Sequence, residues 1–145
     1  MQLSPHFTLA ELTASATATK RGIDNTPDSA ARLRLAYLCQ SILEPIRQRY
    51  GMPIHVTSGY RCPALNKAVG GVATSQHLTG DAADVRASAT NNLYLFRVIE
   101  KMIREGEIEV GQLIWEGGDE HNPAWIHISN PRPDKPNNEI IYLRE

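Results

Sequence analysis

Three shortages in the sequence each exclude a class of protein. Cys39 and Cys62 are the two cysteines among 145 residues, too few for a disulfide framework and at a spacing that fits no thiolate zinc motif. No stretch approaches the roughly 20 apolar residues of a membrane span. The formal net charge of −1 argues against nucleic acid as a partner, because phosphate binding needs a basic surface. Any metal site must therefore use histidines and carboxylates.

The length and composition predict one folded domain. A chain of 145 residues with 41% hydrophobic and 21% charged residues can bury roughly two-thirds of the surface that it exposes when unfolded, so it can form a core without disulfide bonds. Predicted helices come first and predicted strands follow around one inserted helix, which favours an α+β fold with a small antiparallel sheet and helices on one side. We expect one domain over residues 1–145, with a core at about 7–129 and a C-terminal extension at 130–145.

Helical patterns dominate the first third of the chain. Thr8 and Glu11 form a capping box, which predicts a short helix that ends near residue 15. A second helix should run from about residue 26 to Gly51, with a kink or restart at Pro45. Its apolar residues recur at helical spacing: Leu33, Leu35, Leu38, Cys39, Ile42, Leu43 and Ile46. We therefore expect Cys39 to be buried, and its pairing with Cys62 is left open.

The remaining two-thirds alternates between strands, turns and one helix. Residues 59–63 read as a turn, 66–76 as a loop, and 91–105 as a helix with an apolar face. Short β-branched or alternating runs predict five strands: Ile54–Ser58, Ala82–Arg86, Gln112–Glu116, Trp125–Ser129 and an edge strand Ile140–Leu143.

Two of the five histidines lie in informative surroundings. His77 is followed by Gly80 and then Asp84, and a glycine turn can bring a loop histidine and a strand carboxylate together on one metal. The alternative is a plain turn with solvated acids. His127 shares one face of its predicted strand with Trp125, while the isoleucines on either side of it face the core. The alternative for His127 is an ordinary surface position.

Taken together, two imidazoles and one carboxylate indicate zinc. Three protein ligands leave a fourth position for water, which is the pattern of catalytic rather than structural zinc sites. Zinc lowers the pKa of a bound water to about 7 and polarises a carbonyl, so a general base must accompany it.

The motif around these residues resembles a known family. Residues 75–84 read Ser-x-His-x-x-Gly-x-Ala-x-Asp, preceded by Ser58-Gly59-Tyr60-Arg61 and followed by Trp125-Ile126-His127. These three segments are similar to the zinc D-Ala-D-Ala carboxypeptidases and phage L-alanyl-D-glutamate endolysins, whose fold and metal site the hedgehog signalling domain shares. The resemblance spans roughly residues 7–129.

The resemblance implies roles for five residues. His77, Asp84 and His127 would bind one Zn²⁺. Arg61 would lie near the substrate, where a planar guanidinium can hold a carboxylate or steady an oxyanion. Ser75 would bind substrate or orient His77.

The general base is where this chain departs from several relatives. They carry an acid three residues before the last histidine, and here that position is Ala124. We expect Glu116, at the end of a predicted strand, to act instead. Asp119, Glu120 and His121 in the following loop are the alternatives.

The function that follows is hydrolysis of peptide bonds in the stem peptides of bacterial peptidoglycan. Whether the chain is a D,D-carboxypeptidase or an endopeptidase is open. The alternatives are a zinc-stabilised binding domain without catalysis and a domain without metal. We expect a monomer. Residues 1–21 lack the apolar run of a secretory signal, so we expect cytoplasmic synthesis and action on the wall, as a phage or prophage product or after a signal is trimmed.

Overall fold

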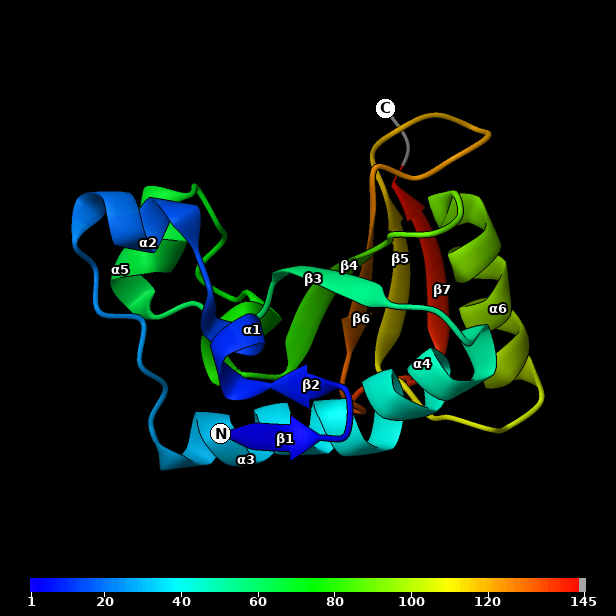
Figure 1. Cartoon of the computed structure of the whole chain (residues 1–145), viewed down its shortest axis with the longest axis horizontal. Coiled ribbons are helices and arrows are strands. Elements are labelled where there is room, and N and C mark those ends of the chain that lie inside the picture. The colour runs from blue at the N-terminus through cyan, green and yellow to red at the C-terminus, as the bar shows by residue number, and fades with distance from the viewer. Residues whose placement is uncertain (144–145) are drawn as a thin grey trace.

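A five-stranded sheet in the order β3-β4-β6-β5-β7 forms the centre of the molecule (Figure 1). In this computed structural model, which describes residues 1–143, its strands are β3 (Ile54–Ser58), β4 (Ala82–Ala87), β5 (Gln112–Glu116), β6 (Trp125–Ser129) and β7 (Glu139–Leu143). The first four are antiparallel neighbours, whereas β7 joins the edge of β5 in parallel. The end of the expected C-terminal extension, residues 144–145, lies outside the described residues.

Helices cover one face of this sheet, as the α+β prediction requires. The helices that contribute to the core on this face are α1 (Leu9–Thr13), α3 (Ser29–Leu38), α4 (Glu44–Tyr50) and α6 (Asn92–Arg104), with a π-helical segment η1 (Cys39–Leu43). The other helical elements are α2 (Ala16–Arg21), α5 (Pro63–Ala68) and a 3-10 turn η2 (Gln76–Thr79). A short hairpin of β1 (Gln2–Ser4) and β2 (Phe7–Thr8) precedes them. In Figure 1, α2 and α5 pack together at the end of the molecule away from α6.

The core lies between the helices and one face of the sheet. Leu35, Leu38, Ile42, Leu95, Phe96 and Ile99 from the helices pack in one cluster with Ala83, Val85, Leu113, Trp115, Ile126 and Ile128 from the strands. Side chains alternate across a strand, so the intervening residues of β4, β5 and β6 face the opposite way. The face of the sheet away from the core can therefore hold polar side chains.

The structure corrects the helix boundaries at several places. A second short helix, α2, follows α1, and the long helix begins at Ser29 because the Asp28 side chain caps it by accepting from the Ala31 N–H. α5 occupies the end of the predicted turn and the start of the predicted loop. It was missed because it is six residues long and its cap is a cysteine, a poor acceptor.

The break expected at Pro45 takes the form of the π-helical segment. Pro45 has no N–H to donate to the carbonyl four residues earlier, and the Glu44 N–H bonds instead to Cys39 O, five residues back. Cys39 is buried, and both cysteines of the described chain are free. Across residues 1–143, no helix has the length and apolarity that crossing a bilayer demands.

Candidate metal centre

His77 enters the site from the turn η2. The Ser75 hydroxyl caps this turn by accepting from the His77 N–H at 3.2 Å. Gly80 ends it at φ 80°, and a Cβ there would lie 2.5 Å from Ala31 O, so the position demands glycine. The His77 ring is buried, with Nδ1 2.7 Å from Gly59 O. Because a carbonyl can only accept, Nδ1 carries the hydrogen and Nε2 presents its lone pair.

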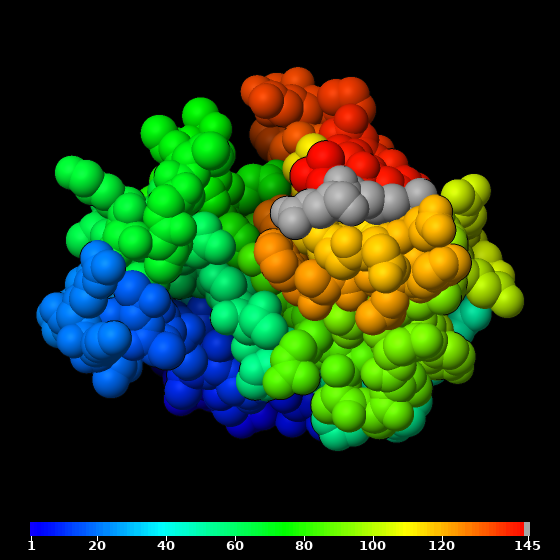
Figure 2. Space-filling model, turned by 90° about the horizontal axis from the view of Figure 1, so that it is seen from above, coloured from blue at the N-terminus to red at the C-terminus, as the bar shows by residue number. Residues whose placement is uncertain are grey.

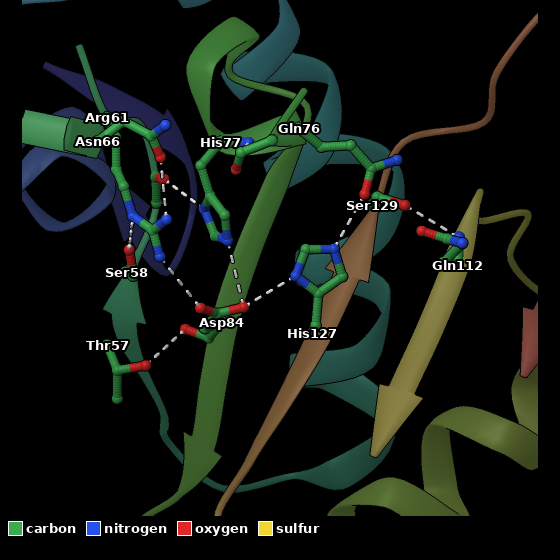
Figure 3. Close-up of polar contacts among 12 residues, drawn as sticks. Thr57, Ser58, Arg61, Asn66, Gln76, His77, Asp84, Gln112, His127 and Ser129 are labelled. Atoms are coloured by element: carbon green, nitrogen blue, oxygen red, sulfur yellow. Dashed lines mark hydrogen bonds and ion pairs between the residues drawn. The ribbon is translucent and has the colours of Figure 1, made fainter. Parts of the chain in front are cut away.

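Asp84 and His127 meet because β4 and β6 pair in the register that sets them directly opposite each other. His127 Nδ1 lies 2.9 Å from Asp84 Oδ1, and His77 Nε2 lies 3.4 Å from the same oxygen (Figure 3). Both rings are buried and meet edge to face, with centroids 5.3 Å apart. Side chains from the turn η2 and from the strands β4 and β6 therefore converge on one point.

The donor atoms at this point fit a divalent cation. One ligand atom from each of His77, Asp84 and His127 lies within 4.8 Å of the other two. Burial alone would raise the pKa of Asp84, but the neighbouring rings of His127 and then His77 outweigh burial and hold that pKa well below its usual range. Two imidazole nitrogens and one ionised carboxylate oxygen are a donor set that zinc takes, with one position left open.

The outer nitrogen of His127 also has a partner, which the sequence reading did not single out. His127 Nε2 lies 3.0 Å from Gln76 Oε1 (Figure 3). Gln76 precedes His77 directly, at a position that the motif leaves variable, so no sequence signal marked it. The sequence motif that contains Gly59 likewise assigns it no role, although its carbonyl orients the His77 ring.

The candidate metal centre lies in a cleft of about 700 Å³. Seen from above, a hollow separates the green chain around residues 65–75 from the orange and red C-terminal part (Figure 2). All six side chains proposed from the sequence line this cleft: Arg61, Ser75, His77, Asp84, Glu116 and His127. Trp125 lines it beside His127, as the strand alternation predicted. Arg132, Asp134 and Lys135, from the C-terminal extension, complete its wall.

Arg61 is held at the edge of the metal centre by its own contacts. Its Nε donates to Ser58 Oγ at 3.2 Å, its Nη1 donates to Asn66 Oδ1 at 3.3 Å, and its Nη2 lies 3.8 Å from Asp84 Oδ2. The Arg61 N–H also donates to His77 O at 3.0 Å. The guanidinium is therefore oriented before any substrate arrives, which suits it to bind an anionic group.

Among the four candidate bases, Glu116 is the one that lines the cleft in the described chain. Burial is the main cause that raises its pKa, and Asp84 acts in the same direction, whereas His127 and His77 oppose it. The Asp119 carboxylate is occupied by the N–H groups of His121 and Asn122.

The other two candidates point into solvent. The side chains of Glu120 and His121 are 74% and 82% exposed, and they face each other at 3.4 Å.

Comparison with known proteins agrees with this geometry. A family model described as Peptidase M15 matches residues 5–129, which include all three convergent side chains. A search of curated proteins finds no match to the chain. Since the family match covers well over half of the sequence, the chain belongs to the peptidase M15 family.

Proposed function

We propose that this protein is a zinc-dependent peptidase that cuts peptide bonds in the stem peptides of peptidoglycan. One observation carries the proposal: His77, Asp84 and His127 converge on the floor of an open cleft that also holds a half-buried acid, Glu116. A purely structural metal site would be closed by a fourth protein ligand and would need no such acid.

Glu116 is the proposed general base. A zinc ion held by the three ligands would supply a Lewis acid that activates water and polarises the scissile carbonyl. The Glu116 carboxylate takes the proton of the attacking water and returns it to the leaving amine. Its raised pKa favours this exchange, because a base works best when its pKa approaches the working pH.

Arg61 is the proposed anion-binding group. Its guanidinium is already oriented by Ser58 and Asn66, so little side-chain entropy is lost when substrate binds. It would hold either the free carboxylate of a substrate or the oxyanion that develops at the scissile carbonyl. Ser75 contributes by capping the turn that presents His77.

The proposed substrate is an extended peptide. Val69 and Val72 on one side of the cleft and Trp125 on the other are exposed apolar side chains that can pack against it. The choice of peptidoglycan among peptides comes from the resemblance to wall-cleaving peptidases. The position of the bond, at a terminal D-Ala or inside the stem, stays open.

Digestion of purified peptidoglycan tests the proposal. Zinc-loaded wild type should release soluble muropeptides, and mass spectrometry of the new termini identifies the bond. Glu116→Gln should bind zinc with wild-type stoichiometry and release almost none. Stoichiometric zinc without any digestion by wild type would instead support a binding domain. Protein that takes up no zinc would defeat the proposal altogether.

A further inference from the structure

Both ring nitrogens of His127 face oxygen atoms. Nδ1 lies 2.9 Å from the Asp84 carboxylate, and Nε2 lies 3.0 Å from the side-chain carbonyl of Gln76. A neutral imidazole carries one N–H and can satisfy one such acceptor. The amide oxygen and the ionised carboxylate both accept and cannot donate, so these two contacts alone allow either tautomer. Asp84 and His127 belong to the same candidate metal site, and a cation held there would take the Nδ1 lone pair, which places the hydrogen on Nε2, opposite Gln76 Oε1.

We infer that Gln76 is a positioning residue that holds His127 in the Nε2–H tautomer and turns its Nδ1 lone pair toward the metal. This inference rests on the proposed zinc peptidase. The nitrogen that does not bind a metal is usually fixed by such an acceptor, which sets the tautomer and the ring orientation.

The two histidines are oriented in opposite senses. In His77 the Gly59 carbonyl takes the Nδ1 hydrogen and leaves Nε2 for the metal. In His127 the Gln76 carbonyl takes the Nε2 hydrogen and leaves Nδ1. His77 would therefore bind the metal through Nε2 and His127 through Nδ1. Histidine ¹⁵N spectra can detect this mixed pattern.

Gln76 suits this task because its backbone is already held. Its carbonyl accepts from the Asp81 N–H at 3.1 Å and from Thr79 Oγ1 at 3.2 Å, within the turn that presents His77. The side chain is partly buried and lines the cleft. One turn thus delivers one histidine directly and orients the second, which comes from strand β6.

Two substitutions of Gln76 distinguish the effect of its acceptor oxygen from the effect of its side-chain size. Gln76→Met keeps the length and removes the oxygen, whereas Gln76→Glu keeps an oxygen acceptor. Gln112→Met is the matched control, because Gln112 lines the same cleft but its amide donates to Glu139 Oε1 at 3.4 Å instead of contacting a histidine.

The experiment measures zinc affinity by chelator competition, together with the histidine ¹⁵N spectrum of the zinc-loaded protein. Wild type should show His127 with a protonated Nε2 and His77 with a protonated Nδ1. Gln76→Met should bind zinc about 10- to 100-fold more weakly and lose the single His127 tautomer. Gln76→Glu should keep the tautomer, and Gln112→Met should match wild type in both measurements.

The outcomes separate this inference from the proposed function. Zinc bound equally by wild type and Gln76→Met, with unchanged tautomers, would overturn the role of Gln76 and leave the peptidase proposal intact. The wild-type spectrum also decides without any variant, because a His127 that carries its hydrogen on Nδ1 contradicts the inference. A wild-type protein that binds no zinc would remove both.

Discussion

Asp84 and His127 stand opposite each other on neighbouring antiparallel strands, and the Asp84 carboxylate lies 2.9 Å from the His127 ring. The same carboxylate oxygen also faces the ring of His77 at 3.4 Å. Because sheet register places the first pair and a glycine-ended turn adds the third group, the site depends on the fold as a whole.

Zinc should stabilise the folded protein. Free zinc at about 100 times its dissociation constant adds about 2.7 kcal/mol if the unfolded chain does not bind it, which raises the melting temperature by roughly 5–10 °C. Differential scanning calorimetry with and without zinc measures this shift. His127→Ala should abolish it, whereas His55→Ala, which alters a histidine outside the ligand set, should leave it in place. An equal shift in both variants would refute the assigned ligands.

Replacement of the proposed base should stop the reaction without loss of metal. Glu116→Gln should lower kcat about 10²- to 10⁴-fold, the contribution typical of general acid–base catalysis. Steady-state kinetics on muropeptides and elemental analysis for zinc provide the two readouts. Glu120→Gln serves as the control, because that side chain is 74% exposed. Full activity in Glu116→Gln would assign the base elsewhere.

Arg61 should contribute to substrate binding through the planar set of N–H donors on its guanidinium group. Arg61→Lys keeps the charge but loses the planar geometry, so kcat/KM should fall roughly 10- to 100-fold, the value of one charge-assisted hydrogen bond. If the partner is a terminal carboxylate, the loss should disappear on amidated substrates. If the partner is the oxyanion, the loss should appear in kcat with both substrates. Unchanged kinetics would exclude Arg61 from the reaction.

Gly80 should be intolerant of a side chain for two separable reasons. Gly80→Ala combines an unfavourable positive φ with a Cβ only 2.5 Å from Ala31 O, so it should cost about 2–4 kcal/mol of unfolding free energy. Gly22→Ala has a similar φ of 66° and open space around the new Cβ, so it should cost only about 1–2 kcal/mol. Urea denaturation measures both, and equal losses would contradict the packing argument.

A buried carboxylate far from the cleft should make stability depend on acid pH. Burial favours a higher pKa for Glu44, but hydrogen bonds from the His6 ring, the His6 N–H and Ser4 Oγ outweigh burial and lower its pKa below the usual 4.5. The stabilisation is therefore present above pH 4.5 and is lost as the pH falls through the lowered pKa of the folded state.

Denaturation of wild type and Glu44→Gln between pH 3 and 7, roughly the range over which a carboxyl group titrates, checks this prediction. The difference in unfolding free energy between the two proteins should shrink toward the acid end. A difference that stays constant with pH would show that the Glu44 charge is not what stabilises this contact.

Much of the fold could be inferred from local patterns. The alternation of apolar residues located β5 and β6 at their observed bounds and put Ile126 and Ile128 in the core. Such signals work because side-chain direction in a strand depends only on neighbouring residues. The short helices α2 and α5 were not predicted, because six residues are too few to show a clear helical periodicity of apolar residues.

The sequence by itself determined which residue types could bind a metal, through the motif that joins His77 to Asp84 and the strand that carries His127. Tertiary structure alone decided the rest: that Glu116 and not Asp119 lines the cleft, that Gln76 reaches His127, and that the C-terminal segment completes the wall. The physical reason is that these contacts join residues far apart in the chain. Strand register and turn geometry place them, and no local pattern of residues records that placement.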